Sequence, residues 1–344
     1  MEKGLTALWY GEHPAASLLQ PLASCYGALL AARRRAYQAG WLRQSSAGKP
    51  VVVVGNLTVG GTGKTPLTLW LARELGARGL EVGIVSRGYG RSGSEPRRVK
   101  PGASWRDVGD EPLILARRSG CRTMVGADRV AAARRLAVDG VDIILADDGL
   151  QHLRLARDCE IVVIDGMRGF GNGRLLPAGP LREPAVLLWQ ADAVVVNGER
   201  EHPSLAGTLP PQGTLAMRLT PLGAERVDGG AEGCPLEAFR GKRVHAVAGI
   251  GNPQRFFAML RERGIEVIEH AFPDHHALAD ADLSFTDELP VLMTEKDAVK
   301  CAEFADARFW YVPVSAELVA GDAEELLSRV LAKVRTAGDA GGRL

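Results

Sequence analysis

Residues 51–65 read Val51-Val-Val-Val-Gly-Asn-Leu-Thr-Val-Gly-Gly-Thr-Gly-Lys-Thr65, and they form the most specific local pattern in the chain. The run of valines is typical of a buried strand in a parallel sheet. The glycine-rich segment after it, followed by a helical pattern, is typical of a P-loop, whose backbone N–H groups and helix N-terminus bind phosphate. The segment therefore predicts a strand, a phosphate-binding loop and a helix in that order.

The loop offers three kinds of phosphate contact. We expect the N–H groups of its glycines to surround phosphate oxygens, the ammonium of Lys64 to contact the β and γ phosphates, and the hydroxyl of Thr65 to bind Mg²⁺. Thr58 stands where the strict motif has its first glycine. The expected nucleotide-binding residues are Thr58, Gly60, Gly61, Thr62, Gly63, Lys64 and Thr65.

A second, mostly apolar run at residues 141–146 ends in Asp147 and Asp148. A magnesium nucleotide site needs a carboxylate at the end of a neighbouring strand, so this run looks like a Walker B segment. One carboxylate can hold the metal or its water shell while the other orients nearby groups. An isolated Asp-Asp is more often a helix cap or a turn, but beside a P-loop we favour the metal-binding interpretation.

The sequence contains no Asn-Lys-x-Asp string of the kind that recognises guanine, so we expect the nucleotide to be ATP. The nearest string is Thr294-Glu-Lys-Asp297, in which lysine and aspartate are adjacent. It closes an expected strand, and it either borders the nucleotide base or caps the following helix.

Strand and helix patterns alternate along most of the chain. We expect buried strands at residues 51–54, 82–85, 143–146, 161–164 and 193–196. This alternation predicts an α/β fold, here a P-loop NTPase-type three-layer α/β/α domain built on a parallel sheet.

The pattern weakens between residues 205 and 241, with one expected strand at 214–219, and then resumes. Strands expected at 244–248, 266–270, 290–294 and 309–312, with helices at 253–263 and 323–334, predict a second, smaller α/β domain. We therefore divide the chain into an N-terminal segment at 1–48, a P-loop domain at 49–215, a linker at 216–241, a smaller domain at 242–336 and a flexible tail at 337–344.

The composition excludes some partners. The chain has 344 residues with 42 Lys plus Arg against 41 Asp plus Glu, so its net charge of +1 gives no bulk attraction for nucleic acid. Five scattered cysteines fit neither a zinc site nor a disulfide framework.

Residues 15–32 are mostly apolar and are followed by Arg33, Arg34 and Arg35. Charge placed after the apolar run argues against a cleaved signal peptide, and the polar residues and proline within it argue against a membrane-spanning helix. We interpret it as an amphipathic helix whose leucines enter the lipid interface while the arginines meet anionic headgroups. The alternative is a helix packed on the protein's own core.

Two loops carry groups that could activate an acceptor hydroxyl, Gly109-Asp-Glu-Pro112 and Asp274-His-His276. An Asp-His pair can share the proton that such a hydroxyl loses. Two further loops, at residues 86–91 and 171–183, combine glycines with arginines and could clamp anions.

Six segments, spread over almost the whole chain, form one larger pattern. They are Gly55-Asn-Leu-Thr-Val-Gly-Gly-Thr-Gly-Lys-Thr-Pro66, Ser86-Arg-Gly-Tyr-Gly-Arg91, Gly109-Asp-Glu-Pro112, Asp147-Asp-Gly-Leu-Gln-His152, Pro177-Ala-Gly-Pro-Leu-Arg-Glu-Pro184 and Asp274-His275. Together they closely resemble the tetraacyldisaccharide 4'-kinases, the lipid A 4'-kinase family.

The resemblance implies that the γ-phosphate of ATP is transferred to the 4'-hydroxyl of a tetraacylated glucosamine disaccharide 1-phosphate, the lipid A precursor, leaving ADP. It implies an Asp-His catalytic pair at Asp110 and His275, with His276 as the fallback. The catalytic candidates are Asp110, His275, Lys64 and Asp148, and the metal candidates are Thr65, Asp147, Asp148, Glu183 and Glu111. The substrate-binding candidates are Arg87, Tyr89, Arg91, Gln151, His152, Arg174 and Arg182.

An acceptor with four acyl chains cannot leave a bilayer cheaply, so the enzyme is expected to go to the lipid. The expected partners are the glycolipid and the membrane surface at the cytoplasmic face of the inner membrane, with no nucleic acid and no obligate protein partner. A different class of function, a P-loop ATPase switch acting on a membrane partner, would use water as the nucleophile and would need neither acceptor-side loop.

Overall fold

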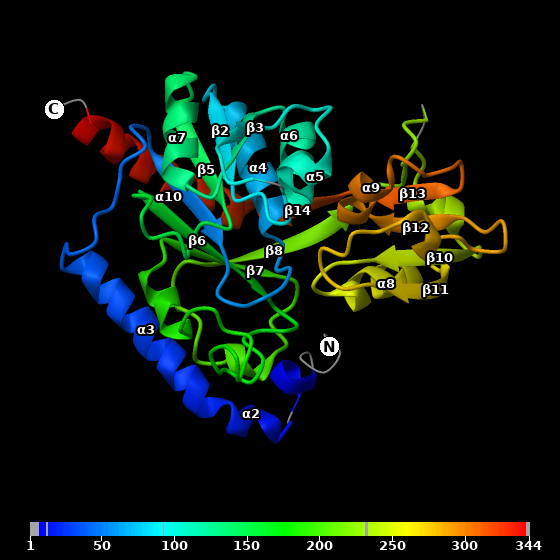
Figure 1. Ribbon diagram of the computed structural model, residues 1–344, viewed down its shortest axis with the longest axis horizontal. Coiled ribbons are helices and arrows are strands. Elements are labelled where there is room, and N and C mark those ends of the chain that lie inside the picture. Colours follow the sequence, from blue (N-terminus) through cyan, green and yellow to red (C-terminus); the bar gives the residue numbers. More distant parts are fainter. Residues whose placement is uncertain (1–6, 12, 92, 231–232, 342–344) are drawn as a thin grey trace.

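Two β-sheets of different size organise the protein, seen in a computed structural model that describes residues 7–11, 13–91, 93–230 and 233–341 (Figure 1). The strands of the larger sheet are β1 (Val51–Gly55), β2 (Val82–Ser86), β3 (Arg97–Arg98), β4 (Arg122–Val125), β5 (Ile143–Asp147), β6 (Cys159–Asp165), β7 (Ala193–Asn197), β8 (Thr214–Pro221) and β14 (Val314–Leu318). The strands of the smaller sheet are β9 (Glu225–Arg226), β10 (Arg243–Ala248), β11 (Glu266–Ala271), β12 (Val291–Thr294) and β13 (Phe309–Val312).

Helices connect and cover these strands. The α-helices are α2 (Ala15–Leu18), α3 (Gln20–Gln38), α4 (Lys64–Gly76), α5 (Trp105–Val108), α6 (Asp110–Ser119), α7 (Arg129–Val138), α8 (Pro253–Glu262), α9 (Glu295–Cys301) and α10 (Ala320–Gly341). The short 3-10 helices are η1 (Ala185–Gln190), η2 (Pro203–Leu205), η3 (Leu236–Phe239) and η4 (Asp280–Asp282).

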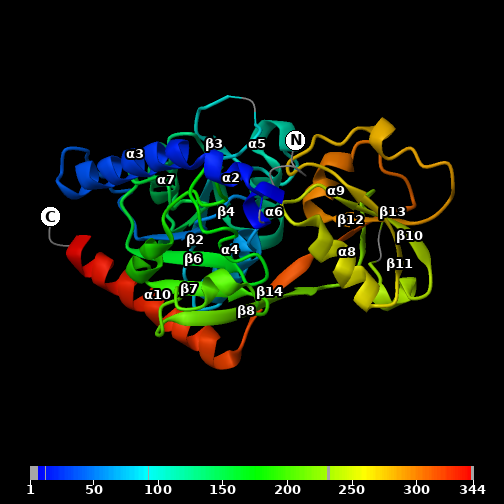
Figure 2. The same ribbon diagram turned by 90° about the horizontal axis from the view of Figure 1, so that it is seen from below.

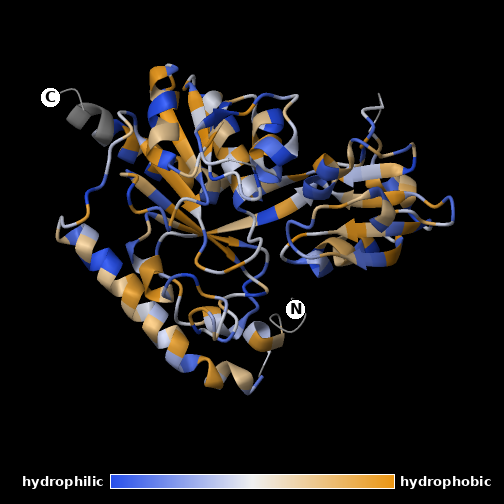
Figure 3. Cartoon of the chain, in the orientation of Figure 1, coloured by the Kyte–Doolittle hydropathy of each residue, from blue (hydrophilic) through white to orange (hydrophobic). Residues whose placement is uncertain are grey.

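The alternation of side chains along β1 explains why helices cover both faces of the larger sheet. Val52 and Val54 belong to a core cluster that contains Leu67 and Leu71 of α4 and residues of α10. Val51 and Val53 point to the opposite face, into a cluster that contains the buried side of α7. A strand buried on both faces can be apolar throughout, as the hydropathy colouring of the central strands shows (Figure 3).

The order of the larger sheet is β14-β8-β7-β6-β1-β5-β2-β4-β3. All pairings from β8 across to β4 are parallel, whereas β14 on β8 and β3 on β4 are antiparallel. From β1 the chain extends the sheet through β5 on one side and β6 on the other. In open α/β sheets, ligands bind outside the carboxyl ends of the strands at such a switch point. This topology places the P-loop, which follows β1, at that position.

The smaller sheet, in the order β11-β10-β12-β13-β9, lies beside the larger one and carries α8 and α9 (Figure 1). We call the larger sheet with its helices the first body, and the smaller sheet with α8 and α9 the second body. The long strand β8 leads from the first body to the second. After β13 the chain returns, because β14 pairs with β8.

The structure confirms the α/β fold with its large, mostly parallel sheet, and each expected strand is present. The limits of the five predicted segments remain a prediction. One difference concerns the helix expected at 323–334, which was assigned to the smaller domain. It is part of α10 and packs on the larger sheet against β6 and β8. Of the tail expected at 337–344, residues 337–341 continue α10 and 342–344 lie outside the described residues.

The N-terminal helices run along the side of the first body opposite to α10 (Figure 2). One side of α3 is attached: the hydroxyl of Tyr26 donates to the carbonyl of Arg182 at 2.9 Å, and Arg34 pairs with Glu183 at 3.1 Å. Leu22 and Leu29 are 59% and 71% exposed. Among the described residues, no helix is both long and apolar enough to cross a membrane.

Candidate active site

The P-loop joins the last residue of β1 to the first residue of α4. Gly60 and Gly63 have φ values of 107° and 99°, in a region that favours glycine. Such a backbone can direct successive N–H groups toward one concave side, where they can bind an anion. The side chain of Asn56 donates to the carbonyl of Gly60 at 3.1 Å, and the N–H of Val59 donates to the carbonyl of Pro180 at 2.8 Å. The loop is therefore held in a defined shape by contacts on both sides.

Asp147 ends β5 and is fully buried next to the first turns of α4. The hydroxyl of Thr68 donates to its Oδ1 at 3.4 Å, but Oδ2 has no hydrogen-bond partner within the described part of the chain. Burial, together with the charges of Glu111 and Asp148, raises the pKa of Asp147 to about 7. A buried carboxylate oxygen without a partner suits a cation or its bound water, so this residue fits a magnesium nucleotide.

Asp148 faces the cations of the site. Its carboxylate lies 3.6 Å from Nζ of Lys64 and 2.8 Å from Nη2 of Arg182, and its carbonyl accepts from Arg129 at 2.6 Å. Burial raises the pKa of Asp148, but the charges of Lys64 and Arg182 outweigh burial and hold that pKa well below its usual range. Asp148 is therefore ionised at any physiological pH, while its φ of 50° turns the chain away from β5.

Asp110 and His275 meet across the two bodies. Asp110 begins α6 after Gly109, whose φ is 93°, and its Oδ2 lies 3.1 Å from Nδ1 of His275, which sits in the loop after β11. His276, the fallback partner, instead contacts Asp282 at 3.1 Å. The two loops predicted to carry an Asp-His pair are thus brought together, with His275 at Asp110.

The electrostatics of this pair favour its charged form. Burial raises the pKa of Asp110, but the hydrogen bond from His275 and the charges of Lys296 and Lys300 outweigh burial and lower it far below the usual range. Burial lowers the pKa of His275, but the hydrogen bond to Asp110 outweighs that effect, so the pKa lies above its ordinary value.

Helix α9 surrounds the Asp110 carboxylate with lysines. Nζ of Lys300, which is 1% exposed, lies 3.5 Å from Asp110, and Nζ of Lys296 lies 2.6 Å from Glu111. The side chain of Thr294 accepts from the N–H of Asp297 at 3.4 Å, so the string at 294–297 caps α9. The helix-cap interpretation of this string is therefore confirmed, and a contact with the nucleotide base stays a prediction.

Two of the predicted metal ligands have a cationic side chain as partner, although the charge of Glu111 also acts on Asp147. Glu183 is almost fully buried and pairs with Arg34, whereas Glu111 pairs with Lys296. No cluster of three or more His, Cys, Asp or Glu side chains suited to a metal occurs among the described residues. Magnesium commonly keeps several waters and takes only one or two carboxylates, so it does not require such a cluster. Thr65, Asp147, Asp148, Glu183 and Glu111 all stay predicted metal-side residues.

The predicted substrate residues divide into two groups. Arg182 and Gln151 lie near the P-loop: Arg182 contacts Asp148, and Gln151 donates to the carbonyl of Asn56 at 3.2 Å. His152 follows Gln151 in the chain, and its carbonyl accepts from Arg157. Burial, with the charges of Arg129 and Arg157, lowers the pKa of His152 to about 4.

The other group lies on exposed loops. The ring of Tyr89 is 4.7 Å from the ring of His275, and Arg87 is exposed beside it in sequence. Arg91 donates to the carbonyl of Glu95, and Arg174 donates to the hydroxyl of Ser17 in α2. Tyr89 is thus the member of this group that the structure brings to the Asp110–His275 pair.

Several residues near the site escaped sequence analysis. Asn56 and Asn197 contact the P-loop, Arg129 donates to the carbonyl of Asp148, and Lys300 pairs with Asp110. Arg255 reaches the loop only indirectly, through its hydrogen bond to Asn197. Asn197 has a detectable signal, because it directly follows the strand predicted at 193–196, at the carboxyl edge of the sheet where the P-loop is expected. Arg129, Arg255 and Lys300 lie in ordinary helices, and nothing local separates them from surface residues.

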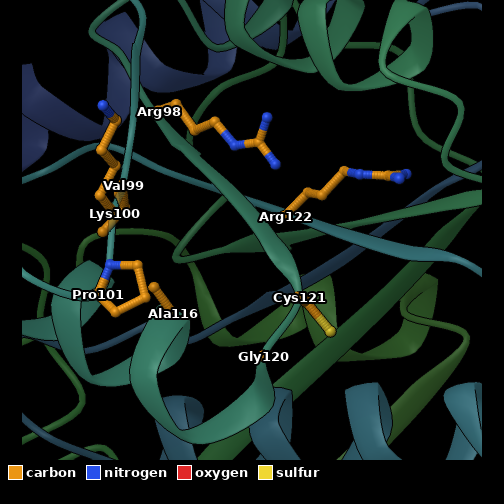
Figure 4. Close-up of a pocket in the computed structure, with 8 residues that line it drawn as sticks. All are labelled: Arg98, Val99, Lys100, Pro101, Ala116, Gly120, Cys121 and Arg122. Atoms are coloured by element: carbon orange, nitrogen blue, oxygen red, sulfur yellow. The ribbon is translucent and has the colours of Figure 1, made fainter.

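The cavity shown in Figure 4 holds none of the predicted site residues. Its volume is about 370 Å³, and it lies between β4, α6 and the segment after β3. Its lining comprises Arg98, Val99, Lys100, Pro101, Ala116, Gly120, Cys121 and Arg122. The P-loop and the Walker B carboxylates therefore lie outside this cavity, at the carboxyl edge of the larger sheet.

The fold and the site define a class: a P-loop protein of the α/β type with a Walker B carboxylate pair beside its loop lysine. The comparisons with known proteins are more specific. A family model described as tetraacyldisaccharide-1-P 4'-kinase matches residues 15–335, and the chain belongs to this family.

Relatives and a solved structure agree with the family assignment. The chain is 50% identical over 326 residues to a tetraacyldisaccharide 4'-kinase of Xanthomonas euvesicatoria, covering 94% of each chain. It is 52% identical over 315 residues to the tetraacyldisaccharide 4'-kinase of Alkalilimnicola ehrlichii, covering 91% of this chain and 92% of the relative. A crystal structure of LpxK from Aquifex aeolicus in complex with ATP superposes with a TM-score of 0.76 at 30% identity, covering 93% of this chain and 99% of that one.

Proposed function

We propose that this protein transfers the γ-phosphate of ATP to the 4'-hydroxyl of a tetraacyldisaccharide 1-phosphate, the lipid A precursor, and releases ADP. The observation that carries this proposal is the family match over residues 15–335, together with relatives named as this kinase at about half identity. ATP is assigned because the structural neighbour binds it and because the P-loop is of the phosphate-binding form.

The nucleotide would be held by the P-loop backbone from Gly60 to Gly63, with Lys64 on the β and γ phosphates. Magnesium, when bound, supplies positive charge that offsets the charge developing on the transferred group, and Thr65, Asp147 and Asp148 would hold it or its waters. The ion pair between Lys64 and Asp148 would hold the lysine side chain at the Walker B segment until a phosphate competes for it.

Proton removal from the acceptor is assigned to Asp110 and His275. Phosphoryl transfer depends mainly on positioning and charge, but the hydroxyl must still lose its proton to a group within hydrogen-bond reach. With His275 neutral, the 3.1 Å contact between the two side chains lets the pair take up that proton and become the ionised Asp110–imidazolium pair that its electrostatics favour. Lys300 stabilises the negative charge of Asp110. We place Glu183 among the residues that anchor α3, because Arg34 already neutralises it.

The acceptor would be held by the substrate-binding candidates. Arg87, Arg91 and Tyr89 lie on the loop next to His275, where a disaccharide ring or its 1-phosphate could be clamped. Arg174 lies beside α2, where it contacts Ser17, and Arg182 lies between α3 and the P-loop, where it contacts Tyr26 and Asn56.

A membrane-bound acceptor would also account for the leucines that are exposed on the N-terminal helices α2 and α3. We propose that Leu18, Leu22 and Leu29 enter the cytoplasmic face of the inner membrane, with Arg33 and Arg35 near anionic headgroups. The enzyme would then reach its four-chain acceptor without extracting it from the bilayer.

The test is transfer of label from γ-labelled ATP to purified tetraacyldisaccharide 1-phosphate in detergent micelles. Wild type should label the glycolipid, Lys64→Ala and His275→Ala should lose at least about a hundredfold in rate, and His276→Ala should retain activity as the matched control. Phosphate release that does not depend on glycolipid, with no labelled lipid, would contradict the proposal and favour an ATPase switch.

A further inference from the structure

Asn197 links the P-loop to the second body. It is buried at the carboxyl end of β7, and both ends of its side-chain amide are used. Its Nδ2 donates to the carbonyl of Thr62 at 3.0 Å, and its Oδ1 accepts from Nη2 of Arg255 at 2.7 Å. Arg255 belongs to α8, so one amide connects a residue inside the phosphate loop to a helix of the other body.

The same guanidinium also meets a buried carboxylate. Nη1 of Arg255 lies 3.7 Å from Oδ2 of Asp165 at the end of β6, and Asp165 is 3% exposed. Its Oδ1 accepts from the N–H groups of Met167 and Arg168 at 3.0 and 3.2 Å, which fixes the orientation of the carboxylate. The Arg255 guanidinium therefore lies between the carboxyl ends of β6 and β7 in the first body. Both contacts are at the edge of the sheet where the P-loop lies.

A second contact brings the backbone of the second body against the loop itself. A Cβ added to Gly251, in the turn between β10 and α8, would lie 2.5 Å from the backbone nitrogen of Gly61 and 2.9 Å from Cα of Gly60. The carbonyl of Gly251 accepts a hydrogen bond from Arg168. The turn before α8 thus approaches the phosphate loop so closely that only glycine fits at position 251.

The loop also fits tightly on Asn197. A Cβ on Gly63 would lie 2.6 Å from Nδ2 of Asn197, so the amide packs on the loop as well as donating to it. A shift of the Asn197 side chain would therefore displace Thr62 and Gly63, which directly precede Lys64.

We infer that Arg255 is a positioning residue for the nucleotide: through Asn197, it makes the shape of the P-loop depend on the seating of the second body. This inference rests on the nucleotide-binding part of the proposed function and not on the identity of the acceptor. The Asp110–His275 contact spans the same two bodies. Nucleotide affinity and assembly of the Asp110–His275 pair then both depend on how the second body is positioned on the first. By thermodynamic linkage, nucleotide binding must favour assembly of the pair, and assembly of the pair must favour nucleotide binding.

The first test measures the dissociation constant of magnesium ADP by calorimetry on the full chain, without glycolipid. Arg255→Ala removes a charged hydrogen bond to Asn197 and should weaken ADP binding about tenfold. Arg255→Lys keeps a cation near Asp165 but cannot contact both partners, so it should recover part of the affinity. Arg261→Ala is the matched control, because Arg261 lies on the same helix and pairs with Glu269 of its own body.

A second variant guards against a simple loss of folding in Arg255→Ala. Gly251 does not have a positive φ, so its own backbone accepts alanine, and the three atoms nearest to the added methyl all belong to Gly60 and Gly61 of the loop. Gly251→Ala should also weaken ADP binding, whereas Gly102→Ala, which meets nothing within 4 Å, should not.

The outcomes separate positioning from stability. A lower melting temperature with the ADP dissociation constant of Arg255→Ala within about twofold of wild type would overturn the inference. So would an equal weakening in Arg261→Ala. Failure of label transfer to the glycolipid, with the Arg255 effect on ADP binding intact, would reject the proposed function and leave this inference standing.

Discussion

At the scale of single residues, Asp147 and Asp148 show how one sequence pair acquires two different charges. Asp147 is enclosed by β5 and α4 and has its pKa raised to about 7, whereas Lys64 and Arg182 hold the pKa of Asp148 well below the usual range. The Asp-Asp pair after an apolar run could be predicted from sequence. Its division of roles could not, because the cations at Asp148 come from α4 and from the loop before η1.

His152 offers a residue-scale test through pH. Its pKa is about 4 in the folded chain and 6.5 when exposed. The unfolded chain therefore binds the proton more readily, and folding loses stability as pH falls from about 6.5 towards 4. Between about pH 7.5 and pH 5, wild type should lose about 1 kcal/mol more than His152→Gln, after allowance for the partial exposure of the ring.

Urea unfolding at the two pH values measures this difference, and His13→Gln, an exposed histidine, is the control that should behave as wild type. An equal pH dependence in wild type and His152→Gln would mean that His152 is not desolvated as described.

At the scale of elements, the predictions succeed where the pattern is local. The strands of β1, β5 and β7 are continuous apolar runs, and a fully buried strand needs no partner information to be recognised. The strands that the sequence does not predict, β3, β4, β9 and β14, are short or half-exposed, and each pairs with a neighbouring strand. Pairing partners of this kind are tertiary information.

The N-terminal helices give the element-scale prediction. Leu22→Glu combined with Leu29→Glu places two charges on the exposed side of α3 and should reduce co-sedimentation with vesicles of anionic lipid severalfold, because the apolar area available to the interface is lost. The melting temperature should be unchanged, since neither leucine is buried.

Val138→Glu is the matched control, because Val138 is 84% exposed at the end of α7, on a different part of the first body (Figure 1). Vesicle binding that falls equally in the control would indicate a general charge effect, and full co-sedimentation of the double variant would exclude α3 as the membrane contact.

At the scale of the whole molecule, function depends on contacts between distant parts of the chain. Asp110 and His275 are separated by 165 positions, and Thr62 and Asn197 by 135. The resemblance to a family pairs Asp110 with His275. The spacing of residues in the sequence cannot, because it does not show how the two sheets are positioned relative to each other. For the same reason, the return of β14 and α10 to the larger sheet was not foreseen.

The two bodies meet through charged side chains as well as through β8 and β14. Lys300 and Lys296 of α9 reach Asp110 and Glu111 of α6, and Arg255 of α8 reaches Asn197 of β7. A site assembled in this way is complete only when the second body is seated on the first. This arrangement suits phosphoryl transfer, in which water must be kept from the γ-phosphate.

We propose that Asp110 and His275 act as one catalytic pair across the two bodies, and a double-mutant cycle on the rate of label transfer distinguishes this from independent action. Asp110→Asn and His275→Ala should each reduce kcat by about a hundredfold to ten-thousandfold, and the double variant should be no slower than the slower single variant. Losses that multiply in the double variant would show that the two residues act independently and would contradict the account.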